Sequence, residues 1–163
     1  MSKPTWHGGL PWGRLRRWYR LVRRTLFSAP EPDRPAVQTD ASLRELRRAL
    51  GQQSFAPNWE YSYHKRGEDL NLARVVYGRH PVRAGTGLDW WQTHVRGWKR
   101  EDGTVDLRAH WEPEPTEHPK AHLDGVGHSI DGGMQKLREA FDEAGIPYTE
   151  DTADPDSPTP SQS

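Results

Sequence analysis

The sequence predicts an α+β fold in two layers, a four-stranded antiparallel meander with flanking helices on one face. Two observations predict the sheet: apolar and polar residues alternate in several segments, and short turns containing Gly or Asp separate them. A third observation predicts the helical layer: an amphipathic helical segment precedes these strands and another follows them. The 163 residues suit one domain with tails, and the apolar fraction of 33% indicates that part of the chain is not packed.

Charge divides the chain into a basic arm and a mildly acidic body, although the net charge is zero. Of the 23 basic and 23 acidic residues, residues 1–40 hold eight and three, which leaves fifteen and twenty for the rest. We therefore expect four parts. They are a basic amphipathic helical arm (1–27), a linker (28–40), an α+β domain (41–148) and a disordered acidic tail (149–163).

The arm has the pattern of a helix with one apolar stripe. The stripe contains Leu15, Trp18, Tyr19, Val22 and Leu26. A solvated helix docked on the body is one interpretation, contact with nucleic-acid phosphates is a second, and binding at an anionic membrane surface is a third. The arginines that would bind nucleic acid are Arg14, Arg16, Arg17, Arg20, Arg23 and Arg24.

The linker and the first helix of the body follow the arm. Three prolines and mixed charge give residues 28–40 no face that could join a core. The next residues predict a helix with Asp40 as its N-cap and Gly51 at its end. Its apolar positions are Leu43, Leu46 and Leu50.

Four segments are predicted as strands and form two hairpins. They are residues 58–64 and 70–77, then 88–100 and 104–112. In the second hairpin, a two-residue turn would set apolar against polar residues on both faces. A three-residue loop with a left-handed Gly103 separates them instead, because a shift of one residue inverts every side chain. The loop predicts an apolar face with the pairs Thr93–Trp111, Val95–Ala109, Gly97–Leu107 and Lys99–Val105.

The other face of this hairpin is predicted to be polar. It places Gln92 opposite Glu112, His94 opposite His110 and Arg96 opposite Arg108. Opposed like charges weaken a sheet, so a functional site is one interpretation of this face and a solvated sheet surface is the other. Trp90 and Trp98 also fall on this side, either as an imperfection or as a stacking surface.

The stretch EPEPTEHPKAHLDG (112–125) follows directly and is stiffened by three prolines. It could fold back over the polar face and bring more histidines to it. The candidate catalytic residues are then His94, His110, His118, His122 and Glu112.

After this stretch, the pattern of residues 129–145 predicts a helix that Asp131 caps and that Gly145 and Pro147 end. Its inner stripe is predicted to be Met134, Leu137, Phe141 and Ala144.

Two chemistries fit such a cluster. Metal-independent RNA cleavage needs an acid and a base, which histidines supply, and a cation for the phosphate, which Arg96 and Arg108 would supply. A metal site is the other, since imidazole and carboxylate suit zinc and similar ions. The chain has no cysteine, and the spacing of His110, His118 and His122 matches no metal motif, so we expect no metal and no cofactor.

The segment HWEPEPTEHPKAH (110–122) resembles the His-rich loop of TumE-type toxins of toxin–antitoxin pairs. The resemblance spans residues 105–123 and includes Trp111, Glu112 and the two histidines around Lys120, without the adjacent His-His pairs of that family. It implies an antiparallel sheet, ribonuclease-like activity and a neutralising protein partner.

The sequence thus predicts a small toxin-like protein that acts on RNA, with His110 and His122 as acid and base in either order and His94 and His118 in support. The alternative is a non-catalytic nucleic-acid or protein-binding module that uses the Arg-rich arm, and a metal-dependent protein is a third possibility. No apolar run approaches the roughly 20 residues that span a bilayer, and no signal peptide is recognisable. We therefore expect a cytoplasmic location.

Overall fold

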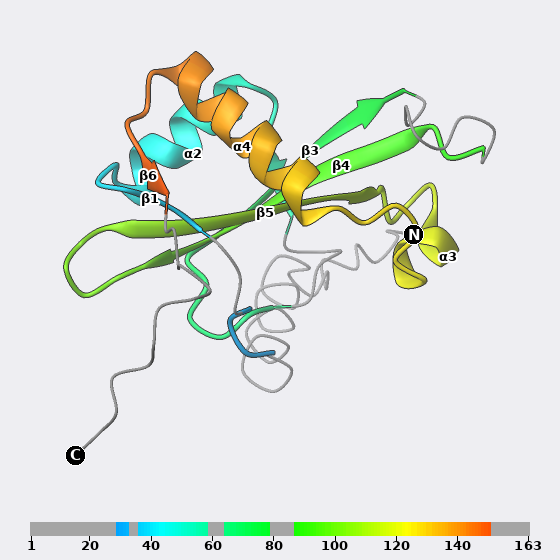
Figure 1. The fold of residues 1–163 in the computed structure, drawn as a ribbon, viewed down its shortest axis with the longest axis horizontal. Coiled ribbons are helices and arrows are strands. Elements are labelled where there is room, and N and C mark those ends of the chain that lie inside the picture. The colour runs from blue at the N-terminus through cyan, green and yellow to red at the C-terminus, as the bar shows by residue number, and fades with distance from the viewer. Residues whose placement is uncertain (1–28, 33–35, 59–63, 79–86, 151–163) are drawn as a thin grey trace, which may run out of the picture.

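A computed structural model describes residues 29–32, 36–58, 64–78 and 87–150 of the chain. These residues form an α+β fold with a six-stranded antiparallel sheet in the order β2-β3-β4-β5-β1-β6. The strands are β1 (Val37–Thr39), β2 (Ala56–Pro57), β3 (Leu70–Tyr77), β4 (Trp90–Lys99), β5 (Val105–Pro113) and β6 (Thr149–Glu150). The helices are α2 (Leu43–Gln52), α3 (Pro119–Leu123) and α4 (Ile130–Ala144). Figure 1 shows α2 and α4 together over one face of the sheet.

The predicted four-stranded meander corresponds only in part to this sheet. The strand predicted at 70–77 is β3, and the second predicted hairpin is β4 and β5. Of the strand predicted at 58–64, only Asn58 and His64 lie in the described part of the chain. The partner of β3 on its outer side is the two-residue strand β2, where Ala56 pairs with Ala73. The central three strands therefore follow the prediction, and the edges do not.

The expected boundaries of the domain need correction at both ends. Residues 28–40 were expected to be a linker without a core face, yet β1 lies in them and pairs with β5 through Val37 and Leu107. Val37 is fully buried, because its pairing with Leu107 sets it on the face of the sheet that carries the core. β6 likewise occupies the first two residues of the expected tail. The expected arm (1–27) and residues 151–163 lie outside the described residues.

Both long helices begin at a serine and not at the predicted aspartate. In α2, Ser42 Oγ accepts the backbone N–H of Glu45 at 3.3 Å, and the Glu45 carboxylate accepts the backbone N–H of Ser42 at 2.8 Å. This reciprocal pair is a capping box, which leaves Asp40 outside the helix. In α4, Ser129 Oγ accepts the N–H of Gly132, and Asp131 lies in the first turn.

One of the two predicted helix ends is confirmed and the other is wrong. Gly51 lies inside α2, whose C-cap is Gln53. Gly145 ends α4 in the left-handed conformation, with φ 65°, as its position predicted. The inner stripe of α4 includes Ala140, whereas Ala144 is exposed.

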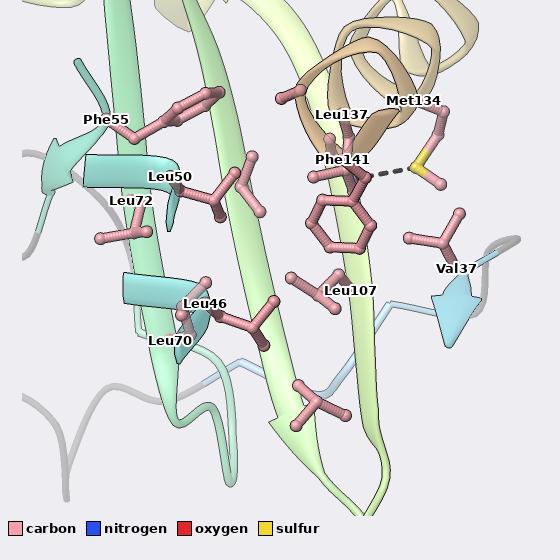
Figure 2. Packing of buried hydrophobic residues seen from close by; sticks show 14 residues of the cluster. Val37, Leu46, Leu50, Phe55, Leu70, Leu72, Leu107, Met134, Leu137 and Phe141 are labelled. Atoms are coloured by element: carbon pink, nitrogen blue, oxygen red, sulfur yellow. Dashed lines mark hydrogen bonds between the residues drawn. The ribbon is translucent and has the colours of Figure 1, made fainter. Parts of the chain in front are cut away.

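The hydrophobic core fills the space between the two helices and the sheet (Figure 2). Leu46 and Leu50 enter it from α2, and Leu137 and Phe141 enter it from α4. Each such side chain stabilises the fold by roughly 1.5–3 kcal/mol when fully buried. The sheet contributes Leu70, Leu72, Val95, Val105, Leu107 and Ala109.

The register of the β4–β5 hairpin confirms the three-residue loop. His94 pairs with His110, Gln92 with Glu112 and Arg96 with Arg108, and Gly103 has a left-handed φ of 96°. Val95, Val105, Leu107 and Ala109 belong to the core, so the helices cover the predicted apolar face. The histidines consequently project from the opposite face.

Two contacts with β5 fix the segment that follows α3, and one of them depends on a glycine. The start of α4 lies so close to β5 that a Cβ on Gly133 would come within 2.1 Å of the Cα of His110. Just before the helix, Ser129 exchanges two backbone hydrogen bonds of 2.8 Å with Trp111. This antiparallel bridge sets His128 beside the histidine-bearing face of β5. Within the described ranges, no helix is long and apolar enough to cross a membrane.

Candidate functional site

The polar face of the hairpin is largely buried and is not a solvated surface. His94 is 2% exposed and Glu112 is 7% exposed. Gln92 and Arg96 are buried beside them. Burying so many polar and charged groups costs free energy unless each of them has partners, so their contacts determine what this face can do.

Glu112 is the centre of the cluster. Its Oε2 lies 3.1 Å from His110 Nε2, and its Oε1 lies 3.3 Å from His94 Nδ1. Gln92 also donates a hydrogen bond of 2.6 Å to Oε1. The strand register places all four side chains on one face, because they come from two directly opposed pairs.

The charge states within the cluster follow from burial and hydrogen bonding. Burial lowers the pKa of His94 to about 3, so its imidazole is neutral at pH 7. Burial alone would raise the pKa of Glu112, but the hydrogen bond with His110 acts in the opposite direction, and the pKa of Glu112 lies below its ordinary value. The carboxylate of Glu112 is therefore ionised.

The second ring nitrogen of His94 contacts a buried chain of polar groups. His94 Nε2 lies 2.9 Å from Asn71 Oδ1, and Asn71 Nδ2 donates to Glu68 Oε1 at 3.2 Å. Glu68 forms a short ion pair with Arg96 through its other oxygen. The amide of Asn71 thus presents its oxygen to His94 because its nitrogen faces a carboxylate.

His94 therefore stands between two oxygen acceptors, Asn71 Oδ1 and Glu112 Oε1. A neutral imidazole carries one ring proton and can donate to only one of them. When Nε2 donates to Asn71, the lone pair of Nδ1 points toward the carboxylate of Glu112. That arrangement is favourable only when a cation lies between the nitrogen and the carboxylate. His94, His110 and Glu112 offer ligand atoms within 4.8 Å of one another, the spacing of a metal site.

Two further histidines lie at the more accessible side of the cluster. His122, on α3, donates a hydrogen bond from Nδ1 to the carbonyl oxygen of Pro113, at 3.0 Å. The same nitrogen lies 3.5 Å from Glu112 Oε2. The ring of His128 stacks on that of His110 with centroids 4.8 Å apart. The side chains of His110 and His122 are 17% and 23% exposed, so solvent reaches this side.

His118 does not join the cluster, contrary to the expectation from sequence. Its Nε2 accepts the backbone N–H groups of Asp89 and Trp90, at 3.3 and 3.2 Å, where β4 begins. His118 is the N-cap residue of α3, whereas His122 lies in the last turn of this short helix. The proline-rich stretch therefore brings one of its two histidines to Glu112 and uses the other to tie the loop to β4.

The two arginines predicted to hold phosphate both contact carboxylates. Arg96 is buried against Glu68, and Arg108 contacts Glu31 Oε1 at 2.6 Å while it lies over the ring of Trp98. Arg100 contacts the same Glu31 carboxylate. The predicted nucleic-acid-binding residues Arg14, Arg16, Arg17, Arg20, Arg23 and Arg24 lie outside the described residues.

Sequence reasoning missed three residues of this site: Asn71, Glu68 and His128. Asn71 lies opposite Arg96 in the β3–β4 ladder, so pairing the two strands would have placed it beside the cluster. His128 had no such signal, because the bridge between Ser129 and Trp111 involves no repeating pattern.

No known protein family, curated protein or solved structure matches this chain. The likeness to TumE-type toxins accordingly stays a prediction.

Proposed function

We propose that this protein is a metal-dependent hydrolase, and that His94, His110 and Glu112 hold a divalent transition-metal ion. The observation that carries the proposal is the position of His94 between two oxygen acceptors. An ion bound at Nδ1 lets His94 keep its proton on Nε2 and removes the contact between a lone pair and a carboxylate. A histidine ligand commonly donates its other N–H to an oxygen in this way.

The distances between the three groups support the proposal. Zinc ligands at roughly 2.0–2.2 Å in tetrahedral geometry lie roughly 3.3 Å from each other. His94 Nδ1 lies 3.3 Å from Oε1 of Glu112 and His110 Nε2 lies 3.1 Å from Oε2, and one ligand atom from each residue lies within 4.8 Å of the other two. The side chains therefore have to draw closer together to hold one ion in tetrahedral geometry. Gln92 fixes the orientation of the carboxylate with its own hydrogen bond. Two imidazoles and one carboxylate suit zinc, iron or manganese.

The number of ligands favours catalysis over a structural role. Structural zinc sites usually have four protein ligands, whereas three protein ligands leave a position for water or substrate. A metal ion lowers the pKa of bound water and polarises a carbonyl or phosphoryl oxygen. His122, beside Glu112 on the more exposed side, is placed to accept or return a proton.

Metal analysis of the purified full chain tests the proposal. We expect about one equivalent of zinc, iron or manganese per chain, or stoichiometric uptake of zinc by protein treated with a chelator. Hydrolysis of bis(p-nitrophenyl) phosphate and p-nitrophenyl acetate should fall to background with EDTA and return with metal. The matched control is the double variant His94→Ala, Glu112→Gln. Wild-type protein that takes up no more metal than this variant contradicts the proposal.

Metal-independent cleavage of RNA is the second candidate, and a specific contact favours it. His110 and His122 approach the same oxygen, Glu112 Oε2, at 3.1 and 3.5 Å, and both are partly exposed. Such a pair could supply the base and the acid that cleavage beside a 2′-hydroxyl requires. This candidate carries with it the neutralising protein partner that the resemblance implies.

Chelation separates the two candidates. Cleavage of RNA that persists in excess EDTA, and that His110→Ala and His122→Ala abolish, favours the second. Cleavage or hydrolysis that EDTA abolishes favours the metal centre. The non-catalytic binding module is tested separately by deletion of residues 1–30, which should abolish a salt-sensitive gel shift with RNA.

A further inference from the structure

A buried polar group lies behind His94, on the side away from Glu112. It consists of Asn71, Glu68, Arg96 and His64. Asn71 is 1% exposed and Glu68 is 0% exposed. This group contacts His94 Nε2 through Asn71 Oδ1, at 2.9 Å.

We propose that Asn71, oriented by Glu68, is a positioning residue that selects the metal-binding tautomer of His94. The inference rests on the proposed metal centre and adds a part to it. Asn71 Oδ1 accepts a hydrogen bond from the N–H at Nε2 of His94. The lone pair of His94 therefore lies on Nδ1 and points toward His110 and Glu112. Without that acceptor, the proton moves to Nδ1 and forms a hydrogen bond with Glu112, which occupies the position of the ion.

The direction of the Asn71 amide is set by charge. If the amide turned over, its oxygen would lie at the 3.2 Å distance from Glu68 Oε1 at which its nitrogen now donates. Two oxygen acceptors at that distance repel each other. Arg96 holds the other oxygen of Glu68, so the carboxylate cannot turn away without breaking a buried ion pair.

A buried ion pair adds little to the stability of the fold by itself, because the cost of desolvating the two charges offsets most of their attraction. The same pair is useful when it fixes a ligand, since outer partners of metal ligands typically alter affinity by about 10–100-fold. Glu68 is also 3.3 Å from His64 Nδ1, which adds a third group to the same carboxylate. The arrangement therefore holds Asn71 in one orientation from several directions.

The first experiment compares zinc affinity of the wild-type chain with that of Asn71→Leu, by competition with a chromophoric chelator. Leucine has the same branching and number of side-chain heavy atoms as asparagine but no acceptor, so we expect binding to weaken about 10–100-fold. The cobalt-substituted proteins should also differ in their visible spectra. Thr93→Val is the matched control, because Thr93 is as buried as Asn71 and lies next to His94 on β4, but on the opposite face of the sheet.

Unchanged affinity in Asn71→Leu, with zinc bound by the wild type, overturns the inference and leaves the metal centre standing. A wild-type chain that binds no zinc removes both. A second measurement needs no variant: histidine ¹⁵N spectra of the zinc-loaded wild type should show His94 protonated at Nε2 and bound through Nδ1. The reverse assignment contradicts the inference even if Asn71→Leu does not fold.

Discussion

His94 and His110 lie directly opposite each other in the β4–β5 ladder, and their rings meet edge to face with centroids 4.9 Å apart. Two facing imidazoles on a buried sheet surface cannot both carry charge at low cost. The carboxylate of Glu112 lies against both rings, so both histidines contact the same negative charge. This relationship explains how a hairpin with unfavourable polar pairs can be stable, and it supplies the first prediction.

Metal should stabilise the fold. An ion that binds only the folded protein adds about 2.7 kcal/mol to the free energy of unfolding when its concentration is 100 times its Kd. We therefore expect the melting temperature of chelator-treated protein to rise when zinc is added in excess. Glu112→Gln keeps the shape of the side chain but removes the negative ligand, and its melting temperature should not respond to zinc. An equal rise in both proteins contradicts the ligand assignment.

The hairpin could be predicted from sequence in unusual detail, because one buried face and a loop with a single left-handed glycine leave few registers. Pairing His94 with His110 followed directly from that register. The short strands could not be predicted in the same way. β1 has three residues and β6 has two, too few for alternation to be recognised, and their place in the sheet depends on β5.

The site was predictable only where the strand register determined it. His94, His110 and Glu112 came together as expected, whereas the placement of His118 depended on where a short helix begins. Both helix caps were assigned to the wrong residue, since Ser42 and Asp40 are equally good N-caps by type. The capping box with Glu45 distinguishes them, because only Ser42 lies three residues before a glutamate.

Gly133→Ala should destabilise the protein. The added Cβ would lie 2.1 Å from the Cα of His110, and backbone cannot yield as a flexible side chain can. Overpacking typically costs about 1–3 kcal/mol, and moving α4 off β5 would also displace His110. Chemical denaturation measures the loss. Gly51→Ala is the control: it lies in α2 with nothing within 4 Å of the new Cβ, so it should stabilise by about 0.5–1 kcal/mol. Equal effects from the two variants would show that the contact at His110 does not limit packing.

Thr93→Val should stabilise the protein. Thr93 is fully buried on the helix-covered face, and its Oγ1 has no hydrogen-bond partner within the described contacts. Valine has nearly the same shape without the hydroxyl, so the desolvation cost of about 1–3 kcal/mol is removed. Denaturation with urea should show a higher midpoint with an unchanged slope. A lower midpoint would indicate that the hydroxyl has a partner, such as a buried water molecule.

The contribution of the Ser42–Glu45 capping box should depend on pH. Hydrogen bonds from Ser42 lower the pKa of Glu45 below its ordinary value of 4.5. A lowered pKa in the folded state means that the stabilisation is present above 4.5 and is lost as the pH falls through the folded-state pKa. The difference in unfolding free energy between wild type and Glu45→Ala should therefore shrink as the pH falls from about 6 to about 3, a range that includes the ordinary pKa of a glutamate. Glu143→Ala, exposed near the end of α4, is the control and should not show that trend.

The ligand set can be tested against its nearest competitor, His122. Its Nδ1 is engaged by the carbonyl of Pro113 at 3.0 Å, so we assign it to proton transfer and not to the metal. His122→Ala should keep zinc affinity within about 3-fold, a difference of less than 1 kcal/mol. His94→Ala and His110→Ala should each weaken binding by at least about 100-fold, since each removes one of three ligands. Isothermal titration of the four proteins with zinc gives the comparison. A loss in His122→Ala as large as that in His94→Ala would place His122 among the ligands and close the position that the hydrolase proposal requires for water.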